Sequence, residues 1–117
     1  MEERALIDAL APLGFVAVEP ETLPFAAQIQ LFNQADVIVG LGGAGLFNAV
    51  FARPGTRIVT IESTAHWVHA HANLFTTAGL DYGVIFGQED PSDTRAMHRR
   101  WHLDVPAAVA AIASALN

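Results

Sequence analysis

Apolar positions in this chain follow two spacings, one typical of helices and one typical of buried strands. A spacing of three to four residues, as between Leu6, Leu10 and Leu13, predicts amphipathic helices, and short apolar runs predict strands. Glycine and proline mark most of the boundaries between them. Helices are predicted over residues 2–13, 24–34, 43–52, 65–78 and 105–116, and strands over residues 15–18, 37–39, 57–61 and 82–86.

This order, one helix followed by four strand–helix units, predicts a single α/β domain over residues 1–117. The strands are apolar throughout rather than alternating, which is typical of a parallel sheet covered on both faces. Right-handed crossovers between such strands give a three-layer, Rossmann-like domain. We therefore expect a mostly parallel sheet of about four strands.

Composition and charge narrow the possible partners. Hydrophobic residues make up 52% of the chain and charged residues 15%, so we expect an apolar face covered by another domain or by a second copy in a homodimer. The net charge of −6 and the lack of lysine argue against nucleic-acid binding. No apolar run is long enough to span a membrane, and the acidic N-terminus does not resemble a signal peptide. A cytoplasmic location is the expectation.

The most informative stretch is the glycine-rich segment after the predicted strand at 37–39. Gly40-x-Gly42-x-x-Gly45 matches the dinucleotide fingerprint, and an acidic residue, Glu62, ends the next strand. Backbone N–H groups at a helix N-terminus hold anions, and glycine permits the tight turn and close approach. The candidate binding residues are Gly42, Gly43, Ala44, Gly45 and Leu46. The alternative is a tight turn with no ligand.

Three other polar residues, Gln28, Asn48 and Arg53, are expected near that turn. Asn48 lies three residues after Gly45 and shares a helix face with it, so it is a candidate ligand contact. Its alternative role is an ordinary helix-surface residue or a hydrogen bond to a neighbouring loop. Arg53 has the alternative of a solvated cation at a helix C-terminus.

Histidines gather at His66, His69 and His71, and His98 and His102 have i,i+4 spacing. The three histidines of the first group cannot all bind one metal ion unless the helix is broken. The second pair does not belong to an HExxH zinc-binding motif. We expect no metal site, and exposed or partner-facing histidines instead. There is no Gly-x-Ser-x-Gly nucleophile elbow and, without lysine, no P-loop.

One long pattern resembles a known family. It consists of LPFAAQI at residues 23–29, LF at 31–32, ADVIVG at 35–40, GAGL at 43–46, Asn48, and FARPGT at 51–56. Together these residues closely resemble the C-terminal part of family 61 glycosyltransferases, and the similarity runs from about Leu6 to Gly87. The combination is far more specific than the glycine triplet alone.

The resemblance implies the donor-binding lobe of a two-lobed, GT-B-type enzyme that transfers a sugar to a glycan or protein acceptor. The donor would be a nucleotide sugar, usually a UDP-sugar, with no obligatory metal or other cofactor. Its diphosphate would meet Gly43, Ala44 and Gly45, with Asn48 and Glu62 as polar contacts. The family usually has a histidine where this chain has Gly42, and its N-terminal lobe is absent, so we expect little or no activity from this chain alone.

Two alternatives to the donor-binding lobe stay open. One is a dinucleotide-binding module in which Glu62 binds the ribose hydroxyls of an NAD-type ligand. The other is an interaction domain with no ligand, whose apolar face forms a homodimer.

Overall fold

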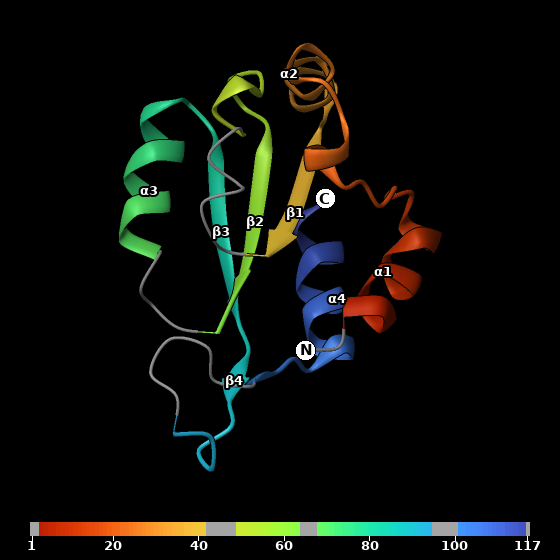
Figure 1. Cartoon of the computed structure of the whole chain (residues 1–117), viewed down its shortest axis with the longest axis vertical. Helices are drawn as coiled ribbons and strands as arrows, with labels where there is room; N and C mark the ends of the chain where they lie inside the picture. The colour runs from red at the N-terminus through yellow and green to blue at the C-terminus, as the bar shows by residue number, and fades with distance from the viewer. Residues whose placement is uncertain (1–2, 42–48, 64–67, 95–100, 117) are drawn as a thin grey trace.

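The computed structural model describes residues 3–41, 49–63, 68–94 and 101–116. Its centre is a parallel sheet of three strands in the order β1-β2-β3 (Figure 1). Ile58 in the middle strand lies beside Ile38 on one side and Tyr82 on the other. The strand bounds are Val37–Leu41 for β1, Arg57–Glu62 for β2 and Asp81–Phe86 for β3.

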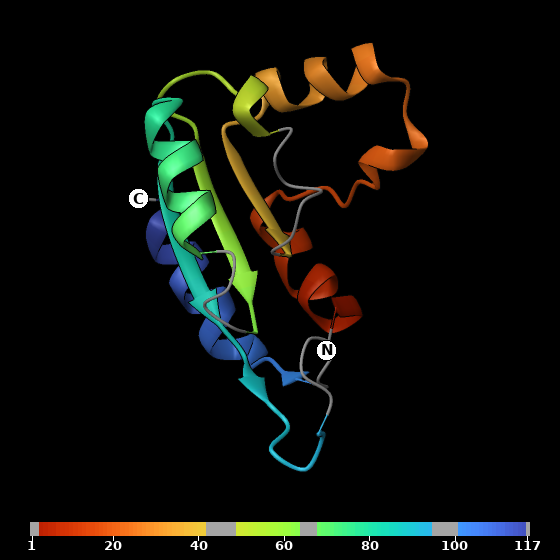
Figure 2. The same ribbon diagram turned by 60° about the vertical axis from the view of Figure 1, so that its left-hand side comes forward.

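Helices cover both faces of this sheet, because alternate side chains of each strand point to opposite faces. Ile58 packs with Phe32 and Phe75 on one face, and Val59 and Ile61 pack with helical leucine and isoleucine residues on the other. Figure 2 shows α3 and α4 on opposite sides of the sheet. The first face carries α2 (Phe25–Gln34) and α3 (Val68–Thr77), and the second carries α1 (Glu3–Leu10) and α4 (Val105–Ala115).

Local sequence signals account for most of these boundaries. Gly14 ends the first helical segment in a left-handed conformation with φ +96°, after a 3-10 turn at Ala11–Leu13. The Asp104 carboxylate caps α4 by accepting a hydrogen bond of 3.1 Å from the Ala107 amide. None of the described helices is both long and apolar enough to cross a membrane. The α/β architecture is therefore as predicted, and it is compatible with a Rossmann-like domain.

The predicted number of strands is wrong, because the parallel sheet has three strands and not four. Residues 15–18 form no strand and join no sheet of the described residues. They run from Gly14 to a 3-10 turn at Pro20–Thr22, and Val16 is 83% exposed. Of this run, Phe15 packs against the core. An apolar run predicts an extended backbone, but it does not determine whether a neighbouring strand lies close enough to pair.

A second, smaller sheet was not predicted. β4 (Gln88–Glu89) and β5 (Trp101–His102) pair antiparallel beyond the end of β3, where the sequence predicted a polar turn. Two residues in each strand are too few for a recognisable alternation of apolar and polar positions. The predicted helix at 43–52 lies mostly outside the described residues, and residues 49–51 form one 3-10 turn.

Gly87 connects β3 to this small sheet and has no room for a side chain. A Cβ atom there would lie 2.7 Å from the His102 carbonyl oxygen and would also meet the Trp101 ring. We expect Gly87→Ala to lower the free energy of unfolding by about 1–3 kcal/mol through overpacking. Denaturant unfolding measures this. The matched control is Gly83→Ala, whose Cβ would find its nearest neighbour, Val59, at 4.0 Å, and equal losses in both variants would contradict the prediction.

Candidate functional site

The carboxyl ends of the three parallel strands lie at one edge of the sheet. Leu41 ends β1 beside Ile61, and Glu62 ends β2 beside Phe86 at the end of β3. Ligands of open α/β sheets bind outside this edge. The glycine-rich segment follows β1 directly, so its chain begins at this carboxyl edge. Gly42, Gly43, Ala44, Gly45, Leu46 and Asn48 themselves lie outside the described residues.

Glu62 is the one predicted site residue that the structure describes, and it is buried. Its side chain is 3% exposed, and its Oε1 lies 3.3 Å from Nδ1 of His71, whose side chain is fully buried. Its Oε2 accepts a hydrogen bond of 3.4 Å from the Thr60 hydroxyl. The carboxylate therefore faces inward between β2 and α3.

One more residue, the half-buried Tyr82, completes this polar cluster. The Thr60 hydroxyl, with Thr60 fully buried, lies 3.1 Å from the Tyr82 hydroxyl on β3. The His71 ring stacks on Phe75, with ring centroids 5.3 Å apart and planes 18° from parallel. We call Thr60, Glu62, His71 and Tyr82 the Glu62 cluster. It joins β2, β3 and α3 immediately below the carboxyl edge of the sheet.

Sequence reasoning missed most of this cluster. His71 was expected to be exposed or to face a partner, and this is wrong, because it is fully buried beside Glu62. The available signal was the alternation Thr60-x-Glu62, which places both side chains on one face of a strand. Nothing in the spacing of the histidines distinguishes His71 from His69, which is exposed.

Burial of Tyr82 raises the pKa of its hydroxyl above the ordinary value of 10. The negative charge of Glu62 adds to this rise, and the Thr60 hydroxyl partly offsets it. Tyr82 is the only tyrosine in the chain, so phenolate absorbance reports on it alone.

We expect Tyr82 in the folded chain to ionise above pH 10, and at about pH 10 in denaturant. The folded state then keeps a proton that the unfolded state loses, so stability falls as pH rises above 10. Absorbance titration and melting temperatures at rising pH measure both effects. Tyr82→Phe should lessen the alkaline loss of stability, and a titration that is identical in folded and unfolded chains would contradict the prediction.

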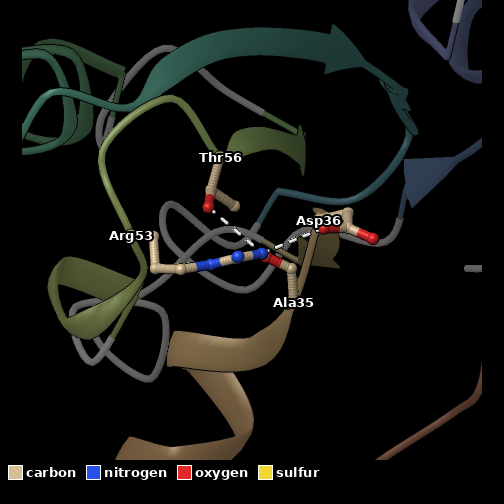
Figure 3. A network of polar contacts seen from close by, with 4 residues as sticks. All are labelled: Ala35, Asp36, Arg53 and Thr56. Atoms are coloured by element: carbon tan, nitrogen blue, oxygen red, sulfur yellow. Dashed lines mark hydrogen bonds and ion pairs between the residues drawn. The ribbon is translucent and has the colours of Figure 1, made fainter.

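Two residues that were expected near the glycine turn, Gln28 and Arg53, lie in different parts of the structure. Gln28 on α2 donates a hydrogen bond of 2.9 Å to the Leu23 carbonyl oxygen. Arg53 lies at the opposite edge of the sheet, where its guanidinium is 3.0 Å from Asp36, the residue before β1 (Figure 3). The Thr56 hydroxyl joins this group through the Ala35 carbonyl oxygen at 3.3 Å. The expectation that Arg53 lies near the turn is therefore wrong, because Arg53 lies beside Asp36 at the amino end of β1.

Candidate metal ligands do not gather in the part of the chain that the structure describes. No three histidine or carboxylate side chains of residues 3–41, 49–63, 68–94 and 101–116 lie together as a metal site would require. His66 and His98 fall outside these ranges.

Comparison with known proteins connects this architecture to one family. No curated protein and no solved structure matches the chain. The family model of glycosyltransferase 61 matches residues 1–59, half of the chain. The match includes the whole of β1 and the glycine-rich segment, and it ends within β2. The chain therefore belongs to the glycosyltransferase 61 family.

Proposed function

We propose that this chain is the donor-binding half of a family 61 glycosyltransferase, which would transfer a sugar from a nucleotide donor to a glycan or protein acceptor. The family match over residues 1–59 carries this proposal, because it includes the glycine-rich segment that follows β1. The parallel sheet supports it, since donor nucleotides fit the carboxyl edge of such sheets. The lobe would be of GT-B type, and the donor a UDP-sugar.

The roles of the individual residues follow from their chemistry. Gly43, Ala44, Gly45 and Leu46 would offer backbone N–H groups to the diphosphate, and Asn48 would offer its side-chain amide. Such donors stabilise the negative charge that develops on the leaving nucleoside diphosphate. Gly42 provides no side chain where the resembling family has a histidine, so we propose weak donor binding and little activity alone.

Glu62 fits a supporting role in this scheme better than direct contact with the ligand. Its carboxylate lies between Thr60 and His71 and is almost inaccessible. A carboxylate that binds ribose hydroxyls needs an accessible oxygen. The inward position of Glu62 therefore also gives no support to an NAD-type ligand.

A thermal-shift screen with UDP, UDP-sugars, GDP-sugars and NAD tests the proposal. A ligand at a hundredfold excess over its dissociation constant stabilises the folded state by about 2.7 kcal/mol. We expect a uridine-specific rise in melting temperature that grows in Gly42→His. Asn48→Ala should reduce the rise, and Arg53→Ala, at the other edge of the sheet, should leave it unchanged. A rise with NAD alone, or none with any nucleotide in either protein, would overturn the proposal.

A further inference from the structure

The lateral edge of the sheet, formed by β1, is different from the carboxyl edge described above. Here some backbone groups of β1 point away from β2, the strand with which β1 pairs. β1 is the outer strand beside β2, and the Arg57 amide donates to the Asp36 carbonyl oxygen, at 3.2 Å. Along a strand, the backbone groups of successive residues point to alternate sides. The backbone N–H and C=O groups of Ile38 and Gly40 therefore point to β2. Those of Val37, Val39 and Leu41 point to the other side of β1, which we call the open edge.

A cavity of about 750 Å³ lies along this open edge. This volume is within the usual range of ligand-binding pockets. Its described walls are β1, α1, α2 and residues 15–19. Figure 1 shows α1 and the chain between α1 and α2 on the outer side of β1. Apolar side chains from all four segments line it, including Ile7, Phe15, Leu31 and Val39. The cavity is large enough for several residues of an extended peptide.

The charge of this cavity selects the kind of occupant. Three carboxylates, those of Glu3, Glu19 and Glu21, belong to its lining, and none of the described lining residues is an arginine. The chain contains no lysine. An anion such as a nucleoside diphosphate would be repelled by these three carboxylates. A second copy of the chain is disfavoured as well, because it would present the same three carboxylates and a net charge of −6.

We propose that this cavity binds an extended peptide segment of another protein, apolar in sequence and carrying basic residues, which adds to β1 as a strand. The outward groups of Val37, Val39 and Leu41 supply the hydrogen bonds, and the apolar walls receive alternate side chains. The three carboxylates attract the basic residues. Recognition would depend on main-chain pairing and on charge together.

The proposal requires that residues 15–18 do not pair with β1 themselves. These residues line the opposite wall of the cavity and belong to no sheet. Hydrogen exchange of the free protein tests this point. We expect the Val39 amide, which points outward, to exchange at least tenfold faster than the Ile38 amide, which bonds to β2. Equal protection of the two amides would show that the edge is already paired, and would overturn the proposal.

Binding is tested with a fluorescent peptide of alternating valine and lysine and the intact chain. Two further peptides carry N-methyl groups on alternate backbone nitrogens, one set in each of the two possible frames. We expect one N-methyl peptide to bind at least tenfold more weakly and the other to bind as the parent does, because only one set of amides faces β1. No binding of the parent peptide, or equal binding of both N-methyl peptides, would overturn the proposal.

Charge is tested on the protein side. Glu19→Gln and Glu21→Gln should each weaken binding about two- to fivefold, as expected for exposed charge pairs, and raised salt should weaken it further. The matched control is Asp8→Asn, which removes the same charge from α1 outside the cavity. Equal losses in all three variants, or self-association of the chain that excludes the peptide, would overturn the assignment of a basic peptide.

Discussion

Replacing Phe75 by alanine should cost this domain about 3–5 kcal/mol of unfolding free energy, as is typical of a fully buried phenylalanine. Phe75 on α3 is completely buried and packs with Phe32 and Ile58 in the core of that face. Its ring also lies against His71 and Tyr82, with centroids 5.3 and 5.8 Å away. The substitution therefore opens a cavity beside the Glu62 cluster as well as removing apolar contact.

Denaturant unfolding of Phe75→Ala and Phe25→Ala gives a matched comparison. Phe25 begins α2, is 61% exposed and touches Phe51 edge to face, with ring centroids 5.9 Å apart. We expect its loss to cost about 0.5–1.5 kcal/mol, the usual worth of an aromatic pair. A domain of this size is stable by roughly 5–15 kcal/mol, so the first substitution removes a large part of the total. Similar costs in the two variants would refute the assignment of Phe75 to the core.

Glu62→Ala should cost about 1–3 kcal/mol, because it removes the acceptor of a buried hydrogen bond from the interior. His71 has its side chain fully buried 3.3 Å from the carboxylate, and Thr60 loses its acceptor at 3.4 Å. Unfolding of Glu62→Ala, His71→Ala and the double variant forms a cycle. We expect the double variant to cost less than the sum of the two, by about 0.5–3 kcal/mol.

The control for Glu62 is the exposed carboxylate of Asp81. Asp81 lies 3.5 Å from Arg57 across the starts of β3 and β2, and its side chain is 69% exposed. Such exposed pairs contribute about 0–1 kcal/mol, so Asp81→Ala should have a small effect. If Glu62→Ala were as mild as Asp81→Ala, or if the cycle were additive, the Glu62 cluster would not stabilise the fold.

The fold could be predicted wherever a residue's surroundings come from its own segment. The spacing of Leu6 and Leu10, the proline and glycine boundaries, and the cap at Asp104 are local, and they gave the helices and the three parallel strands. Pairing partners are not local. Residues 15–18 are as apolar as a strand but join no sheet of the described residues, and β4 and β5 are too short to show a pattern.

The candidate site was predicted less completely, for a similar reason. The residue pattern between residues 23 and 56 predicted the family, which the match over residues 1–59 confirms. The order of strand, glycine segment and following strand predicted a binding site at the carboxyl edge, and this stays a prediction. The direction in which a polar side chain points depends on elements far along the chain. Glu62 is buried because α3, with His71, covers its face of β2, and Arg53 lies beside Asp36 at the other edge. The contacts predicted for Gly42, Gly43, Ala44, Gly45, Leu46 and Asn48 stay predictions.

The hydrophobic cores on the two faces of the sheet differ in how much of the chain must be synthesised before each core can form. The core beneath α2 and α3 uses residues from Phe32 to Leu80. The opposite core places Leu6 and Leu10 against Ala108 and Ile112. Translation runs from the N-terminus, so α1 is made before the other described helices but lacks the cover of α4 until Ala108 and Ile112 have been added. Among the described helices, the one made earliest is therefore among the last to be buried.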